Sequence, residues 1–137
     1  MQVRRLGSRD LALAEDLVSN FLGPPRDAES LEAWLVDERN VAVAALVAGH
    51  CVGLAYGYRL ARLDRRSDGL LLYSIDVLES ARRRGIGKRL VEGMRKEAPG
   101  PMWLLTNESN EGAMALYRRS GGHRPNPDDV MWTFPAE

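Results

Sequence analysis

The chain has little cysteine, little histidine and no net charge. Cys51 is its single cysteine, so no disulfide can form within the chain, and His50 and His123 are its two histidines. So few nitrogen and sulfur ligands give little support to a metal site, and we expect none. The 19 basic residues balance the 19 acidic ones. Overall charge therefore does not favour nonspecific binding to nucleic acid.

Long apolar runs are missing as well. No run approaches the ~18–20 apolar residues that cross a bilayer, and the start of the chain lacks the apolar region of a secretory signal. Cys51 lies in an apolar stretch, where we expect a buried, unreactive thiol. These features predict a cytoplasmic protein without a membrane partner. The 137 residues, 45% of them hydrophobic, suit one domain, residues 1–137.

Apolar periodicity predicts an alternation of strands and helices. Strands are expected at 3–6, 41–47, 51–60, 70–77, 102–106 and 130–134. Helices are expected at 10–21, 28–37, 86–98 and 111–120. The order β-α-α-β-β-β-α-β-α-β predicts an α/β (mixed α+β) domain, whose central mixed sheet has helices on both faces. The strand at 70–77 is apolar enough to be buried on both faces, and its connection to 102–106 should be parallel and right-handed.

A basic turn, residues 82–89, follows the expected strand at 70–77 and leads into a helix. It reads Arg82-Arg83-Arg84-Gly85-Ile86-Gly87-Lys88-Arg89 and is called the basic loop below. The first turn of a helix has unpaired N–H groups and partial positive charge. Glycines let the backbone approach a ligand, and arginines add charge. The basic loop is therefore predicted to bind an anion, such as a pyrophosphate.

Spacing excludes two common phosphate loops. A dinucleotide fingerprint needs a third glycine where Leu90 stands. A Walker P-loop needs glycine at Arg82 and Ser or Thr at Arg89. The remaining pattern, Arg-x-x-Gly-x-Gly, resembles the acyl-CoA-binding loop of the GNAT superfamily, the GCN5-related N-acetyltransferases.

A second segment, residues 106–122, strengthens the resemblance. Within it Asn110 and Tyr117 are seven residues apart, which places them on one face of a helix. The segment is similar to the second GNAT signature, in which the Asn and Tyr approach the pantetheine arm and the thioester sulfur. His123 stands where that family usually has an aromatic residue. The resemblance covers residues 41–122 in detail and implies the GNAT fold, with about six or seven strands.

The resemblance also implies a reaction: an amine of a small, cationic acceptor attacks acetyl-CoA directly, and no metal is needed. Tyr117 would protonate the leaving thiolate, and backbone groups near Val77 would polarise the thioester carbonyl. The cofactor-binding residues it implies are Ile75, Val77, Arg82, Arg83, Arg84, Gly85, Ile86, Gly87, Lys88, Arg89, Asn110 and Tyr117.

The general base remains open among Asp76, Glu79 and Glu108. Asp76 could instead pair with a neighbouring arginine, and Tyr117 could instead be a core residue. Residues 73–87 and 128–134 resemble the aminoglycoside 3-N-acetyltransferase type I branch, although Ser74 replaces an acidic residue of that branch. The carboxylates expected at the acceptor entrance, which favour a polycationic amine, are Asp27, Glu29, Glu32, Asp76, Asp128 and Asp129.

Two other classes of protein fit the same pattern. One is a noncatalytic acyl-CoA-binding sensor or interaction module, and the other is a nucleotide-binding regulator. Release of CoA in the presence of amines separates the enzyme from the sensor. The exposed last strand, 130–134, could also support a homodimer.

Overall fold

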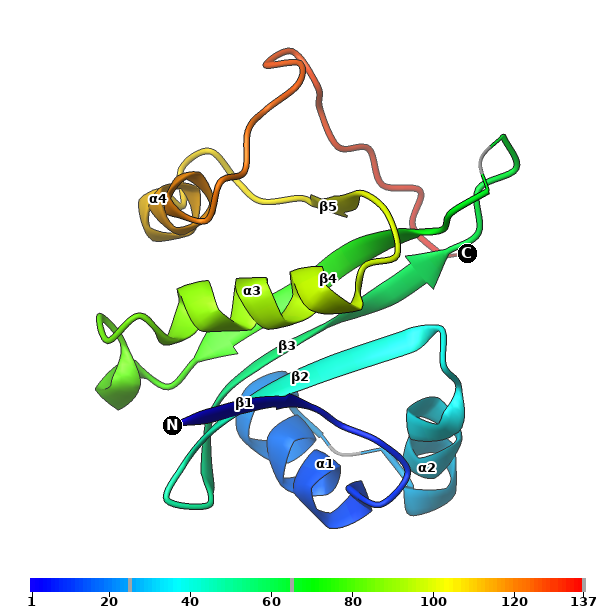
Figure 1. The fold of residues 1–137 in the computed structure, drawn as a ribbon, viewed down its shortest axis with the longest axis vertical. Coiled ribbons are helices and arrows are strands. Elements are labelled where there is room, and N and C mark those ends of the chain that lie inside the picture. Colours follow the sequence, from blue (N-terminus) through cyan, green and yellow to red (C-terminus); the bar gives the residue numbers. More distant parts are fainter. Residues whose placement is uncertain (25, 65, 137) are drawn as a thin grey trace.

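The computed structural model describes residues 1–24, 26–64 and 66–136. A sheet of five strands forms its centre, in the order β1-β2-β3-β4-β5 (Figure 1). The strands are β1 (Gln2–Arg5), β2 (Asn40–Val47), β3 (His50–Leu60), β4 (Gly69–Val77) and β5 (Met102–Leu104). Neighbours from β1 to β4 are antiparallel, whereas β5 is parallel to β4, as the sequence predicted.

Helices cover both faces of this sheet, which confirms the predicted fold class. They are α1 (Leu11–Leu17), its π-helical continuation η1 (Val18–Leu22), α2 (Ala28–Val36), the 3₁₀ turn η2 (Glu79–Ala81), α3 (Ile86–Glu97) and α4 (Glu111–Arg119). Figure 1 shows α1 and α2 on one side of the sheet and α3 on the other.

Alternation along β2 creates a core on each face. Val41, Val43 and Ala45 pack in the cluster that contains Leu90 and Met94 of α3. The intervening Ala42 and Ala44 pack in the cluster formed with α1 and α2. Burying one large apolar side chain stabilises the fold by about 1.5–3 kcal/mol, so these two clusters hold the sheet and its first three helices together.

The strand β4 is buried along only half of its length, which corrects the prediction that both faces are covered throughout. Leu70 and Leu72 are buried, whereas Tyr73 is 64% exposed. The reason is that β5 pairs only with residues 70–72. In addition, Tyr56 pairs with Ser74 while Gly57 pairs with Leu72. Tyr73 is therefore the extra residue of a β-bulge, a feature that re-aims side chains.

The prediction of a last strand at residues 130–134 is wrong. This segment runs as exposed irregular chain, seen at the red end of Figure 1, and its Trp132 and Phe134 side chains are 80% and 93% exposed. β propensity reflects packing on a half-buried sheet rather than an intrinsic backbone preference. The three-residue β5 offers little edge for pairing. The sheet therefore has five strands instead of six or seven.

Candidate active site

The basic loop has an unusual backbone. Arg83 and Gly85 both have positive φ, at 65° and 77°, and Gly85 is the N-cap of α3. A left-handed conformation costs a non-glycine residue roughly 1–2 kcal/mol. Arg83 therefore carries strain of the kind that is often found at ligand-binding sites.

This backbone leaves a run of N–H groups free. In the described part of the chain, the N–H groups of residues 83–88 find no hydrogen-bond acceptor. The first helical bond runs from the Arg89 N–H to the Gly85 carbonyl, at 3.2 Å. Free N–H groups at the start of a 12-residue helix favour an anion, because the helix dipole adds partial positive charge there.

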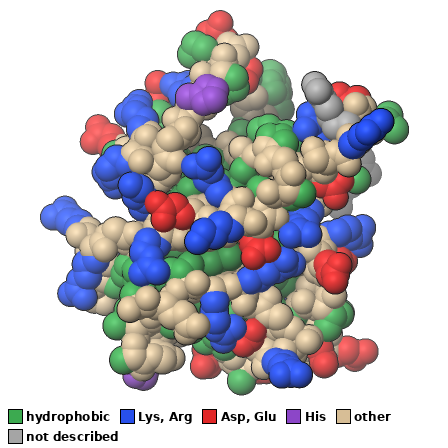
Figure 2. Space-filling view, in the orientation of Figure 1, with side chains coloured by type: hydrophobic (Ala, Val, Ile, Leu, Met, Phe, Trp, Pro, Cys, Tyr) green, Lys and Arg blue, Asp and Glu red, His purple; other side chains and the backbone are tan. Residues whose placement is uncertain are grey.

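The arginines of the basic loop have different surroundings. Arg83 and Arg84 are exposed and form no ion pair with a described residue, and Figure 2 shows basic side chains gathered at the edge where this loop lies. Arg82 instead turns back to β4, where its Nε donates to the Val77 carbonyl at 3.1 Å and its Nη2 lies 3.8 Å from Asp76 Oδ1. Arg82 thus supports the end of β4, and the arginine pairing considered for Asp76 is present.

Gly87 also has a packing role that the sequence did not indicate. A Cβ at this position would lie 3.1 Å from Leu116 Cδ2. The absence of a side chain at Gly87 therefore lets α4 approach the first turn of α3. This contact brings the helix that carries Tyr117 next to the basic loop.

The second half of β4 has an open edge, residues 73–77. The strands β4 and β5 pair only through Leu70–Met102, Leu71–Trp103 and Leu72–Leu104. Beyond these pairs the side of β4 that would face β5 has no strand partner in the described chain. An extended ligand with amide groups can hydrogen-bond to such an edge as an added strand would. Ile75 and Val77, predicted to contact pantetheine, lie in this stretch.

Two predicted site residues lie on α4. Burial raises the pKa of Tyr117, so its hydroxyl is protonated at neutral pH and can donate a proton. Asn110 caps the helix, since its Oδ1 accepts the Ala113 N–H at 3.1 Å. The cap leaves the Asn110 amide NH₂ without a bond to any described residue.

The remaining candidate groups lie outside this arrangement. Glu108 pairs with Arg124 at 3.3 Å, and Glu79 is exposed in η2. Cys51 is half-buried rather than buried, and burial raises the pKa of its thiol, which donates to the Gly53 carbonyl. A protonated thiol is a poor nucleophile. No cluster of three potential metal ligands occurs among the described residues, and none of the helices described could span a membrane.

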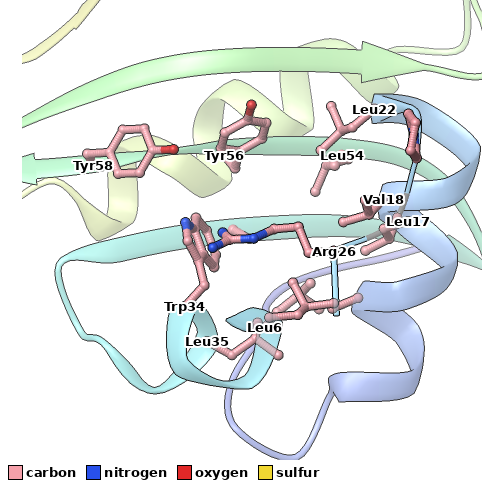
Figure 3. Close-up of a pocket in the computed structure, with 14 residues that line it drawn as sticks. Leu6, Leu17, Val18, Leu22, Arg26, Trp34, Leu35, Leu54, Tyr56 and Tyr58 are labelled. Carbon is pink, nitrogen blue, oxygen red and sulfur yellow. The ribbon is translucent and has the colours of Figure 1, made fainter. Parts of the chain in front are cut away.

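A cavity of about 240 Å³ opens on the other side of β4, between the sheet and the first helices (Figure 3). Its walls are mostly apolar. They are formed by Leu6, Ala14, Leu17, Val18, Leu22, Pro24, Arg26, Leu31, Trp34, Leu35, Ala42, Leu54, Tyr56 and Tyr58. In the β3–β4 register Leu54 lies opposite Asp76 and Tyr56 opposite Ser74. The cavity therefore lies one strand away from the open edge of β4. It is a candidate site for the acceptor and is called the acceptor pocket below.

Comparison with known families identifies the fold. The model described as "Acetyltransferase (GNAT) family" matches residues 10–122, which is most of the chain. The chain belongs to the GNAT family. It is accordingly an acyl-CoA-dependent N-acetyltransferase.

Solved acetyltransferases share this fold across nearly their whole length. An aminoglycoside acetyltransferase from an uncultured soil metagenomic sample is 24% identical, with 99% of this chain and 98% of that chain covered at a TM-score of 0.88. A ribosomal-protein-alanine N-acetyltransferase from Brucella melitensis biovar Abortus 2308 is 20% identical (97% and 100%, TM-score 0.73). The aminoglycoside N-acetyltransferase AAC(6')-Iy, in complex with CoA, is 18% identical (98% and 99%, TM-score 0.76). Comparison with curated proteins gives no match.

This GNAT domain has acceptor-pocket residues that the sequence argument missed. None of the six carboxylates expected at the entrance lines the acceptor pocket. Trp34, Tyr56, Tyr58 and Arg26 line it instead. The sequence did contain a signal for Tyr56 and Tyr58. Alternation along residues 51–60 places them, with Leu54, on one face of a strand.

Proposed function

We propose that this GNAT enzyme transfers an acetyl group from acetyl-CoA to the primary amine of a small acceptor by direct attack. The amine group of the acceptor is cationic in solution, because a free primary amine is protonated near neutral pH. The observation that carries the proposal is the run of free N–H groups at residues 83–88, next to the open edge of β4. We expect this reaction to occur in the cytoplasm.

The donor occupies two adjoining features in this proposal. Its pyrophosphate accepts hydrogen bonds from the basic loop, and Arg83, Arg84 and Lys88 add charge. Its pantetheine arm lies along the open edge of β4, residues 73–77, where Ile75 and Val77 supply backbone partners. Asn110 flanks the arm from the start of α4.

The chemical step needs two protons removed from the acceptor nitrogen and one supplied to the leaving thiolate. The neutral amine nitrogen attacks the thioester carbonyl carbon, and the resulting oxyanion is stabilised by backbone N–H groups near Val77. The C–S bond then breaks, and the Tyr117 hydroxyl donates its proton to the departing thiolate to give CoA. Asp76 accepts, directly or through a water molecule, the proton that the acceptor ammonium loses before attack. The second proton, lost from the nitrogen as the amide forms, returns to the Tyr117 oxygen.

The test is CoA release with acetyl-CoA and a panel of amines, in the wild type and in Tyr117→Phe. Removing the hydroxyl should lower turnover by roughly ten- to ten-thousand-fold. Acetyl-CoA affinity, measured by calorimetry in the same variant, should hardly change because the ring remains. Wild-type turnover in Tyr117→Phe would remove Tyr117 from the mechanism, and no CoA release with any amine would overturn the proposed reaction.

The homodimer is also a proposal. It rests on the exposed apolar side chains of residues 130–134, which would be covered by a second copy of the chain. Sedimentation equilibrium of the wild type and of Trp132→Ser tests it, and a wild-type monomer at all concentrations would exclude it.

A further inference from the structure

The acceptor pocket has one charged residue among its described lining residues, and that residue is basic. Arg26 lies just before α2, and the other lining residues are apolar or aromatic. Asp27, next in sequence, is engaged as the cap of α2, since its carboxylate accepts the N–H and the hydroxyl of Ser30 at 2.9 and 2.8 Å. The pocket therefore offers apolar surface and one positive charge.

Arg26 is placed to meet a ligand. It is exposed and makes no hydrogen bond or ion pair with a described residue. In Figure 3 its side chain extends across the pocket, and its guanidinium points toward the end lined by Trp34. A guanidinium binds a carboxylate through two parallel hydrogen bonds, which gives both affinity and orientation.

The aromatic wall is organised before any ligand arrives. The rings of Trp34, Tyr56 and Tyr58 meet edge to face, with centroids 6.2 to 6.3 Å apart. Tyr73, at the bulge of β4, extends this group with a centroid 5.6 Å from that of Tyr56. Such contacts fix the rings, so an aromatic or branched apolar group can bind against them at a small cost in side-chain entropy.

We propose, building on the acetyl transfer above, that the acceptor is an amino carboxylate with a large apolar or aromatic side chain, such as an apolar α-amino acid. Its side chain occupies the acceptor pocket, its carboxylate pairs with Arg26, and its amine is directed toward the end of β4. The register places the second half of β4 beside this pocket, since Leu54 and Tyr56 in the pocket lie opposite Asp76 and Ser74.

The size of the pocket agrees with this class. An apolar cavity of about 150 Å³ is large enough to bind benzene, and this pocket measures about 240 Å³. An aromatic side chain therefore fits with room for its connection to the amine and carboxylate.

A polycationic amine fits the same walls poorly. Each additional ammonium group would lose water without gaining a carboxylate partner, which is costly in an apolar site. Arg26 would also repel it. Because the fold is shared by enzymes named for aminoglycosides and for ribosomal-protein alanine, the lining of the pocket decides the acceptor class.

The experiment compares kcat/KM for phenylalanine, phenylethylamine, spermidine and an aminoglycoside. Phenylalanine should exceed the others at least about tenfold. Phenylethylamine differs from phenylalanine only in lacking the carboxylate. In Arg26→Gln the kcat/KM for phenylalanine should fall about tenfold, while that for phenylethylamine is unchanged, so that phenylalanine loses its advantage. The matched control is Arg9→Gln, because Arg9 is an exposed arginine that does not line the pocket.

Preference for spermidine or the aminoglycoside would overturn this assignment while leaving the acetyltransferase function intact. An equal loss for phenylalanine and phenylethylamine in Arg26→Gln would also overturn it, as would no turnover with any of the four by an enzyme that binds acetyl-CoA. A wild type that fails to bind acetyl-CoA by calorimetry would instead remove the proposed function, and the acceptor assignment with it.

Discussion

Residues 1–94 and residues 95–136 are built very differently. Every fully buried apolar side chain of the described chain lies between Leu6 and Met94. Neither β5 nor α4 has a fully buried residue, yet α4 carries Asn110 and Tyr117. The proposed acceptor pocket thus rests on a packed core, whereas the helix proposed to donate the proton is held by partial contacts. Regions with few buried contacts open at low free-energy cost, so acetyl-CoA should order the second region more than the first.

The largest expected effect is on stability. Leu90 is fully buried on α3, so Leu90→Ala should lower the free energy of unfolding by about 2–5 kcal/mol. Leu116→Ala on the half-buried face of α4 should cost less than about 2 kcal/mol, because less apolar contact is lost. Urea unfolding of both variants measures this difference. Equal losses would show that the two regions are equally well packed.

The next effect is on donor affinity. Changing Arg83 and Arg84 together to Gln should weaken acetyl-CoA binding by roughly five- to thirtyfold, since two exposed charge contacts are each worth up to about 1 kcal/mol. The matched control is the same double change at Arg118 and Arg119, an adjacent exposed pair at the end of α4. Calorimetric titration with acetyl-CoA compares the two double variants. An equal loss of affinity in both would indicate only a general effect of net charge.

The smallest effect concerns the well-packed region. Arg4 donates two hydrogen bonds to Asp10, at 3.1 and 2.9 Å, and this pair holds the pKa of Asp10 below its usual range. The Asp10 carboxylate also accepts the Gly7 N–H at 2.8 Å. Because Arg4 is partly exposed, Asp10→Asn should cost only about 1 kcal/mol at pH 7.

The sign of the pH dependence follows from the lowered pKa. An acid whose pKa is lower in the folded state stabilises the fold above its unfolded pKa of about 3.9. That contribution is lost as the pH falls from there through the folded pKa. Wild type and Asp10→Asn should therefore differ in unfolding free energy at pH 7 and converge in strong acid. A difference that is independent of pH would show that the ion pair contributes nothing.

Local patterns predicted most of the fold. All four expected helices and the first five strands are present within a few residues of their predicted bounds, because apolar periodicity depends on nearby residues. The prediction of a strand at residues 130–134 failed because strand pairing requires a neighbouring strand edge, which the sequence does not reveal. The burial of β4 was overestimated for the same reason, since it depends on where β5 ends.

The donor side of the site was more predictable than the acceptor side. The basic loop is a contiguous motif whose free N–H groups depend on local backbone, so spacing alone could propose residues 82–89 as an anion site. The acceptor pocket is built from side chains far apart in sequence. Whether Glu29 or Trp34 faces the cavity depends on how α2 rotates against the sheet, and the packing selects Trp34.

The central claim is that the free N–H groups of residues 83–88 hold the pyrophosphate of acetyl-CoA. The most direct measurement is calorimetric titration of the wild type with acetyl-CoA and, separately, with acetyl-pantetheine, which lacks the pyrophosphate and the nucleotide. We expect acetyl-CoA to bind at least about a hundredfold more tightly, because charge-assisted hydrogen bonds to the phosphates are strong. Equal affinities, or no binding of acetyl-CoA at all, would contradict the assignment of the basic loop.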